Sequence, residues 1–223
     1  MTLNIGIITE DSNAKLPPIN KWKSKIGRGK NIENIPEIKS LLKKNHLKIP
    51  DNDIENEELY TEILKDYIRQ AKFMFSGNFS EIRNFSNFLE KYGKVNFYIL
   101  SGRYGMIKDN KIIIPYNYHL NSESKLLELD NKTNFSNIIN EVCKKSDILF
   151  ISLPTYIMGY VINKNVLITE NNSLKIAVCG NFYLDIMKEN GFLTYPRLGV
   201  VRLGKDNRFK IIDLIDNYYK SKQ

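Results

Sequence analysis

Short, almost continuous apolar runs recur along the chain at residues 3–8, 95–100, 148–151 and 175–179. Each run is only four to six residues long and is rich in Ile, Val, Leu or Phe. Central strands of a parallel sheet are buried on both faces, so their sequences are apolar throughout and do not alternate with polar residues. The pattern therefore predicts four buried strands.

Amphipathic segments with apolar residues three and four positions apart lie between these runs. They predict helices over residues 57–71, 79–92, 135–142, 182–188 and 211–219, with Thr133 capping the third, and with Gly93 ending the second and Gly191 the fourth. Strands that alternate with helices favour a parallel sheet with right-handed crossovers. We expect an α/β fold with a mostly parallel central sheet and flanking helices, in a single domain spanning residues 1–223.

Residues 11–54 break this pattern. Prolines at 17, 18, 36 and 50 and glycines at 27 and 29 stand among lysines and asparagines, and only residues 35–42 indicate a weak helix. We interpret residues 11–54 as a basic, loop-rich insertion after the first strand.

Composition narrows the class of protein. Hydrophobic residues make up 42% of the 223 residues and charged residues 26%, which disfavours disorder. No apolar run reaches the roughly 18 residues of a membrane span, and the first residues lack the pattern of a signal peptide, so we expect a cytoplasmic protein without a membrane partner. Cys143 and Cys179 have no metal-ligand spacing and are expected to be buried and reduced. No motif predicts a cofactor or a metal site.

The formal net charge of +8 favours polyanionic partners such as nucleic acid, DNA or tRNA. Much of the excess lies near the N-terminus, where cations alternate with the single tryptophan and with glycines. Phosphate-binding cations beside a stacking aromatic ring are typical of nucleic-acid contacts. The candidate nucleic-acid-binding residues are Lys21, Trp22, Lys23, Lys25, Arg28 and Lys30. A solvated, lysine-rich loop is the alternative interpretation.

Three predicted strands end in small or hydroxyl-bearing residues followed closely by tyrosine, at residues 101–105, 152–156 and 180–183. Ligands of parallel sheets bind beyond the carboxyl ends of the strands, so these loops are expected to share a pocket. The candidate ligand-binding residues are Ser101, Gly102, Arg103, Tyr104, Pro115, Tyr116, Asn117, Ser152, Thr155, Gly180 and Asn181. Arg103 would clamp an anion, Tyr104 or Tyr116 would stack on a base, and Asn117 would read a polar edge. Tyrosines of the core with hydroxyls at its rim are the alternative.

Residues 99–107, which read ILSGRYGMI, and residues 114–117, which read IPYN, carry a family resemblance. They resemble the "LSAKYGLL … I-PYD" signature of an uncharacterised prokaryotic α/β family that is itself similar to the peroxide-stress YaaA proteins. The resemblance covers roughly residues 59–215 and is specific around residues 100–117. It implies a mixed α/β fold and a link to nucleic acid, through DNA binding in the peroxide-stress relatives and a likeness to a catalytic domain of tRNA archaeosine synthesis.

Two departures from that signature bear on catalysis. Arg103 stands at the lysine position, and a guanidinium stays protonated, which excludes a lysine nucleophile or base there. Asn117 stands at the aspartate position, so a general-base carboxylate is lost, leaving Asp109, Glu10 or Asp11 as substitutes. The remaining catalytic candidates are Ser101, Tyr116 and Asn181.

The first hypothesis is a nucleic-acid-associated protein that binds a nucleotide or nucleobase at the carboxyl ends of parallel strands. One alternative is a base-modifying or glycoside-type transferase acting on nucleic acid, and another is a small-nucleotide sensor. A carboxylate within hydrogen-bond reach of the pocket would favour the transferase. A pocket lined only by Arg, Asn, Ser and Tyr would favour binding alone.

Overall fold

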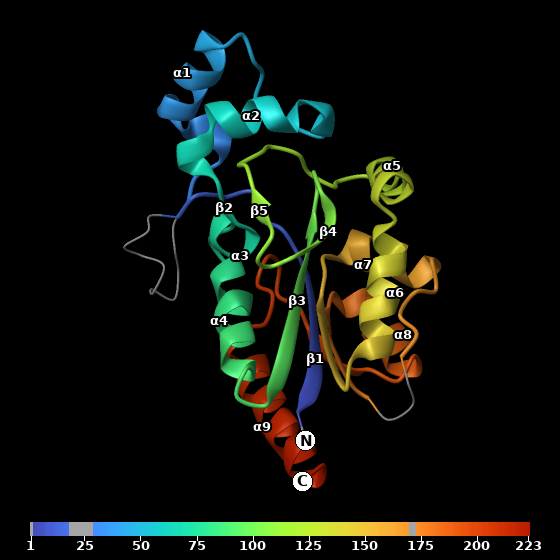
Figure 1. The fold of residues 1–223 in the computed structure, drawn as a ribbon. Helices are drawn as coiled ribbons and strands as arrows, with labels where there is room; N and C mark the ends of the chain where they lie inside the picture. The colour runs from blue at the N-terminus through green and yellow to red at the C-terminus, as the bar shows by residue number, and fades with distance from the viewer. Residues whose placement is uncertain (1, 18–28, 170–172) are drawn as a thin grey trace.

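A twisted six-stranded sheet forms the centre of the molecule in the computed structural model, which describes residues 2–17, 29–169 and 173–223 (Figure 1). The strands are β1 (Leu3–Glu10), β3 (Gly93–Ser101), β4 (Gly105–Lys108), β6 (Ile148–Ser152), β7 (Leu174–Cys179) and β8 (Leu193–Pro196). Their order is β4-β3-β1-β6-β7-β8. Within the described residues every pairing of this sheet is parallel except that of β3 with β4. The expected α/β class with a mostly parallel sheet is confirmed.

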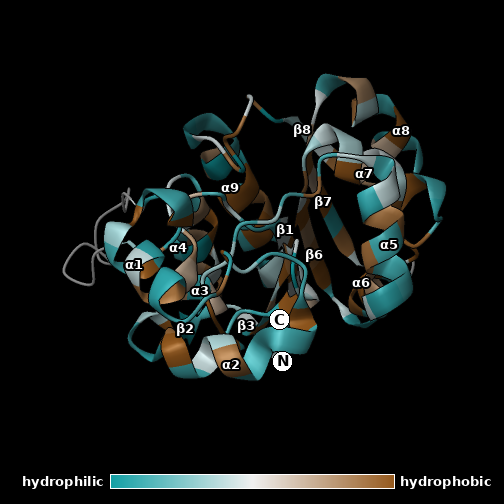
Figure 2. Cartoon of the chain, turned by 90° about the horizontal axis from the view of Figure 1, so that it is seen from above, coloured by the Kyte–Doolittle hydropathy of each residue, from teal (hydrophilic) through white to brown (hydrophobic). Residues whose placement is uncertain are grey.

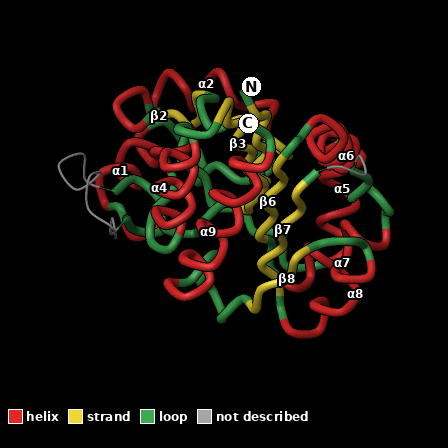
Figure 3. Tube along the Cα trace, turned by 90° about the horizontal axis from the view of Figure 1, so that it is seen from below, coloured by secondary structure: helices red, strands yellow, loops and turns green. Residues whose placement is uncertain are grey.

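Helices cover both faces of the sheet (Figures 1 and 3). One face packs against α3 (Ala71–Met74), α4 (Phe79–Leu89) and α9 (Lys205–Ser221), and the other against α5 (Glu123–Thr133), α6 (Phe135–Lys145), α7 (Thr155–Asn163) and α8 (Leu184–Glu189). The apolar sides of these helices turn inward, while their polar sides face outward (Figure 2). This is the layered arrangement that strands buried on both faces require.

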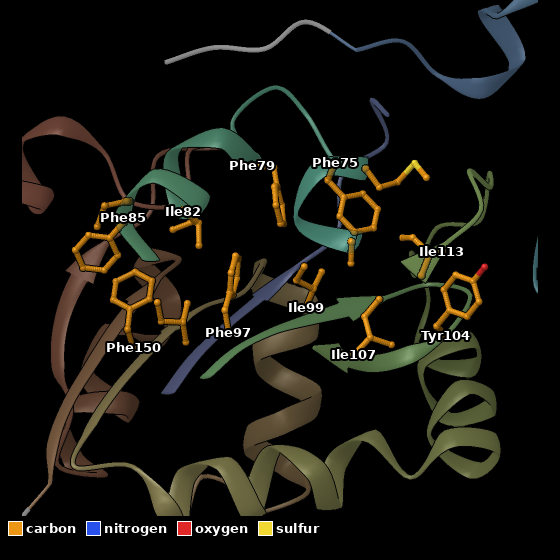
Figure 4. Packing of buried hydrophobic residues seen from close by; sticks show 14 of the residues in the cluster. Phe75, Phe79, Ile82, Phe85, Phe97, Ile99, Tyr104, Ile107, Ile113 and Phe150 are labelled. Carbon is orange, nitrogen blue, oxygen red and sulfur yellow. The ribbon is translucent and has the colours of Figure 1, made fainter. Parts of the chain in front are cut away.

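Aromatic rings fill the layer between the sheet and α4 (Figure 4). Phe79 of α4 stacks on Phe97 of β3 with ring centroids 5.9 Å apart, and Phe85 meets the edge of Phe150 of β6 at 5.1 Å. All four rings are buried. Fully burying a side chain of this size contributes roughly 1.5–3 kcal/mol to folding, so this layer is a main source of stability.

A small helical subregion lies beyond the carboxyl ends of β1 and β3 (Figure 1). It contains η2 (Ile32–Asn34), α1 (Pro36–Lys44), η3 (Ile54–Asn56), α2 (Glu57–Ile63) and η4 (Lys65–Tyr67), followed by β2 (Arg69–Gln70), which pairs antiparallel with β5 (Ile112–Ile113). The weak helix expected over residues 35–42 corresponds to α1. The single helix predicted over residues 57–71 is wrong, because the backbone becomes extended at Ile68 to pair with β5.

Two predicted helix boundaries also change. Gly93 begins β3 instead of ending a helix, and a Cβ atom there would lie 2.1 Å from the carbonyl oxygen of Leu3 on the neighbouring strand. Thr133 ends α5, with its hydroxyl donating to the carbonyl of Leu129, and Asn134 precedes α6. Gly191 follows α8 with φ +80° as predicted. Strands β2, β4, β5 and β8 and helices α3, α5 and α7 were not predicted.

The order of the strands fixes where a ligand would bind. From β1 the chain first crosses to β3 on one side and later places β6 on the other side. The loops that follow β1 and β6 therefore diverge, and a crevice opens beyond their carboxyl ends. Both termini lie together at the opposite end of the sheet (Figure 1).

Cys143 and Cys179 are buried and unpaired, as predicted. Burial raises the pKa of the Cys143 thiol to about 12 and that of Cys179 to about 11, which leaves both thiols unreactive at neutral pH. Within the described residues, no helix combines the length and apolar character that a membrane crossing requires.

Candidate functional site

A cleft of about 550 Å³ opens at the carboxyl ends of the central strands. It is lined by residues at or after the ends of β1, β5, β6 and β8, among them Glu10, Asp11, Ser12, Asn13, His119, Tyr156, Arg197 and Arg202. Its volume lies within the range of about 300–1,000 Å³ that small-molecule sites occupy. The cleft stands at the switch point between β1 and β6, where the topology predicts a ligand site. We call it the strand-end cleft.

Asp11, the first residue after β1, places a carboxylate in this cleft. Its Oδ2 accepts hydrogen bonds from the hydroxyl of Tyr116 and from the backbone N–H of Gly102, the latter at 3.0 Å. Its own backbone N–H donates to the carbonyl of Leu100 at 2.9 Å. Both side-chain contacts fall on Oδ2, so Oδ1 has no hydrogen bond to any described residue. The carboxylate is thus held in one orientation with one oxygen left for a ligand.

Tyr116 and Ser101 form the support behind Asp11. The Tyr116 hydroxyl lies 2.7 Å from Ser101 Oγ, and Ser101 Oγ also accepts the backbone N–H of Tyr104 at 3.1 Å. Complete burial and the adjacent charge of Asp11 raise the pKa of Tyr116 well above its ordinary value. Tyr116 therefore remains protonated and donates its hydrogen to the carboxylate across the working pH range.

Glu10 lies in the cleft beside two arginines. Its Oε1 accepts from Arg197 Nη2 at 2.6 Å, and its Oε2 accepts from Arg197 Nη1 at 3.3 Å. Arg202 Nη2 forms an ion pair with Oε1 at 3.0 Å. Burial acts to raise the pKa of Glu10, but the charges of Arg202 and Arg197 oppose it and hold that pKa below its ordinary value. The two neighbouring carboxylates thus have different surroundings: Glu10 is neutralised by guanidiniums, and Asp11 is bound by a neutral hydroxyl and an amide. Such a pair suits separate chemical roles.

Two further titratable groups adjoin Asp11. The ammonium of Lys15 is buried, lies 4.5 Å from the centre of the Tyr116 ring and donates to the carbonyl of Ser12 at 3.0 Å. Burial lowers the pKa of Lys15 to about 8, against a smaller opposing effect of Asp11. Burial, and then the charge of Lys15, lower the pKa of His119, so its imidazole is neutral at pH 7.

The position of Arg103 differs from the one expected, and the prediction that its guanidinium faces the cleft is wrong. The side chain is fully buried on the side of the helical subregion, between Asp53 and Glu57. Tyr104 turns the same way, and its hydroxyl donates to Glu57 Oε1 at 2.5 Å. The physical reason is that Asp53, in the predicted loop region, and Glu57, at the start of α2, are close enough to satisfy the guanidinium together with two backbone carbonyls.

Most other predicted ligand-binding residues lie in the layer behind the cleft or away from it. Ser152 Oγ donates to the carbonyl of Arg202 at 2.6 Å, and Asn117 binds Pro50 and Glu33 of the helical subregion. Pro115 is buried, Thr155 begins α7, and Gly180 and Asn181 stand at the start of η5 (Asn181–Tyr183). Gly102 contacts the cleft through its amide on Asp11. The three predicted loops do lie at one edge of the sheet, but different side chains line the cavity.

Four residues that line the cleft were not among the predicted ligand-binding residues. They are the acidic pair at the end of β1, Glu10 and Asp11, and the arginines after β8, Arg197 and Arg202. Glu10 and Asp11 were weighed as distant substitutes, and their signal was two carboxylates directly after a buried strand. Arg197 and Arg202 had no local signal. Asp109, the third substitute, pairs with Lys72 at 3.1 Å and does not line the cleft. Within the described ranges, no group of His, Cys, Asp and Glu is arranged to hold a metal ion.

Of the predicted nucleic-acid-binding residues, Lys21, Trp22, Lys23, Lys25 and Arg28 lie outside the described residues. Lys30 is exposed, and its backbone exchanges two hydrogen bonds of 2.9 Å with Lys15. Asn31 lines the strand-end cleft. The described residues on both sides of this basic stretch therefore lie beside the cleft.

Comparisons of the chain with protein-family models, with curated proteins and with solved structures found no match. The resemblance to the YaaA-like family stays a prediction.

Proposed function

We propose that the chain binds a nucleotide or nucleobase in the strand-end cleft and acts on it through Asp11, as a base-modifying or glycoside-type transferase. The observation that carries this proposal is the carboxylate of Asp11, which has one oxygen fixed by Tyr116 and Gly102 and the other available in the cleft. A carboxylate in the pocket was the feature expected to separate catalysis from binding alone. It makes the transferase the best-supported of the three hypotheses.

The chemistry follows from what such a carboxylate can do. In a glycoside-type transfer, Asp11 Oδ1 attacks the sugar carbon that carries the base, while the bond to the base breaks and its electron pair leaves with the base. A proton must reach the departing base nitrogen, and an acceptor base or water later displaces Asp11. Tyr116 keeps its proton and acts as a positioning residue that orients the carboxylate. The half-exposed ring of Tyr156, at the cleft wall, offers a face for stacking the base.

The test is to incubate the protein with nucleosides, nucleotides, tRNA and single-stranded DNA, and to measure the release or exchange of free base by liquid chromatography and mass spectrometry. We expect Asp11→Asn to lower the rate by roughly 10²–10⁴-fold, because an amide neither attacks carbon nor accepts a proton at neutral pH. Asp185→Asn is the matched control, since Asp185 is exposed on α8 and does not line the cleft.

Two outcomes would contradict the transferase. Ligand binding without any release or exchange of base would leave a binding protein or a small-nucleotide sensor. A sensor would be stabilised against heat by free nucleotides but not by oligonucleotides. Equal activity of Asp11→Asn and the parent protein would exclude the proposed role of this carboxylate.

A nucleic acid as the natural form of the ligand is a second proposal. It is supported by the net charge of +8 and by the position of Lys15, Lys30 and Asn31 on both sides of the basic stretch and beside the cleft. Filter binding of DNA and tRNA across a salt series tests it. We expect the logarithm of the affinity to fall linearly with the logarithm of the salt concentration. Absence of affinity at low salt would contradict it.

A further inference from the structure

Arg202 enters the floor of the strand-end cleft with unused hydrogen-bond donors. Its Nη2 donates to the carbonyl of Asp11 at 2.6 Å and forms an ion pair with Glu10 Oε1 at 3.0 Å. Its Nε is buried and has no hydrogen-bond partner among the described residues. A guanidinium carries five N–H donors, and a buried donor without a partner is rare in folded proteins. The described residues do not supply the missing partner, and a ligand that enters the cleft can supply it.

Arg197 and Arg202 share one internal carboxylate. Glu10 accepts two hydrogen bonds from Arg197 and forms an ion pair with Arg202, and the side chains of the two arginines are only 5% and 6% exposed. These two buried guanidiniums gather their N–H donors around a single carboxylate at the cleft floor. Burial lowers the pKa of Arg202, which shows the same cost of desolvation.

The surroundings leave room and donors for an anion. Asn31 and Asn78 line the cleft walls, and Ser12 stands beside Asp11. Gly199, between the two arginines in the chain, has open space where a side chain would stand. The other charged groups nearby are Asp11, held by Tyr116 and Gly102, and Glu81, whose carboxylate accepts the backbone N–H groups of Leu203 and Gly204. Both acids already have partners, so neither replaces the missing anion at Arg202 Nε.

We infer that Arg197 and Arg202 form a phosphate subsite, so that the strand-end cleft takes a phosphorylated nucleoside in preference to a nucleoside or a free base. This inference rests on the proposed function, because it names the class of ligand for the same cleft. Guanidiniums bind phosphate oxygens with paired hydrogen bonds, and a phosphate brings both the charge and the acceptors that Arg202 lacks. Glu10 competes with the phosphate for the same donors.

Calorimetric titration separates these ligands. The probes are the common purine and pyrimidine nucleosides, their 5′-monophosphates and inorganic phosphate. We expect the preferred monophosphate to bind at least about tenfold more tightly than its nucleoside, a ratio that corresponds to about 1.4 kcal/mol. Arg202→Lys and Arg197→Lys should each reduce this ratio toward one, because an ammonium cannot make the paired hydrogen bonds. Arg208→Lys, on α9 and outside the cleft lining, is the matched control and should leave the ratio unchanged.

Glu10→Gln is expected to increase phosphate affinity, and a variant that failed to fold could not produce such an increase. Removal of the competing carboxylate frees the two guanidiniums, so monophosphates and inorganic phosphate should bind more tightly, by several-fold, while nucleosides should not. A cluster with a purely structural role predicts no such gain. Circular dichroism and the melting temperature of each variant establish that it is folded.

The outcomes distinguish this inference from the proposed function. Equal affinity for nucleoside and monophosphate, weaker phosphate binding by folded Glu10→Gln, or no binding of any monophosphate or inorganic phosphate would overturn the phosphate subsite. Selective, Arg202-dependent binding of monophosphates without any base release would uphold the subsite and overturn the transferase.

Discussion

Two buried arginine clusters lie on opposite sides of the loop that follows β3, and they differ in how completely the protein satisfies them. In the first, all five N–H donors of Arg103 are used, by Asp53, Glu57 and two backbone carbonyls, at 2.6–3.1 Å. In the second, Arg202 uses only Nη2, and its Nε is buried without a partner in the described part of the chain.

This difference distinguishes an arginine with a structural role from one that can bind a ligand. Burial acts to lower the pKa of Arg103, but the hydrogen bonds that it donates to Asp53 and Glu57 outweigh burial and raise that pKa, whereas burial prevails and lowers the pKa of Arg202. Arg103 thus ties the helical subregion to the sheet, and its donors are closed to any ligand. Arg202 instead borders the cleft with a buried Nε that no described residue satisfies. A buried arginine is informative about a ligand only when its donors are counted.

The largest effect is expected where the closed cluster is broken. Arg103→Met leaves the carboxylates of Asp53 and Glu57 without their main partner in a buried place, and we expect the free energy of unfolding to fall by about 3–5 kcal/mol. Urea denaturation measures it.

Lys48→Met is the control for Arg103→Met. Lys48 also contacts Asp53, at 3.6 Å, but its side chain is 62% exposed, so its removal should cost less than about 1 kcal/mol. Similar losses in the two variants would contradict the assigned role of Arg103.

Lys15, on the cleft side, is a buried cation that, unlike Arg103, forms no ion pair within the described ranges. Its pKa falls from 10.5 to about 8 on folding, so the folded state resists its protonation. The resulting destabilisation is complete below pH 8 and disappears as pH rises to 10.5. The free energy of unfolding of Lys15→Met minus that of the parent protein should therefore depend on pH. We expect this difference to be on the order of 3 kcal/mol larger at pH 7 than at pH 10.5.

The measurement for Lys15 is urea denaturation of both proteins at a series of pH values. The difference between them isolates this ammonium, since the tyrosines and other groups that titrate at high pH are common to both. A difference that does not change with pH would show that Lys15 is as easily protonated in the folded state as in the unfolded state.

Arg202→Met is expected to have a smaller effect than Arg103→Met or Lys15→Met. Glu10 keeps its two hydrogen bonds to Arg197, and the substitution also removes a buried donor that had no partner. We expect the free energy of unfolding to change by less than about 2 kcal/mol. A loss as large as that of Arg103→Met would mean that both clusters are structural, and the comparison would fail.

The fold could be predicted well where a strand is buried on both faces. β1, β3, β6 and β7 are near-continuous apolar runs, because they occupy the middle of the sheet. The edge strands β4 and β8 have only four residues each, too few for a distinct pattern. The helix expected over residues 57–71 was overridden by pairing with β5, a contact that no local propensity reveals.

The site could be predicted only in its location. The topology placed it at the carboxyl ends of parallel strands, where the cleft lies. The side chains could not be assigned, because Arg197 meets Glu10 across 187 positions of sequence, and Arg103 meets Asp53 across 50. A guanidinium in a ligand-binding motif looks the same in sequence whether it is paired internally or not. Only the three-dimensional positions of the acids decide between the two.

Both ends of the chain lie at the end of the sheet opposite the cleft, and this has a practical consequence (Figure 1). An affinity tag or a surface linker fused to either end would project away from the opening. The immobilised protein would therefore present an unobstructed cavity to ligands in flow, and the choice of terminus for attachment should not alter the binding constants.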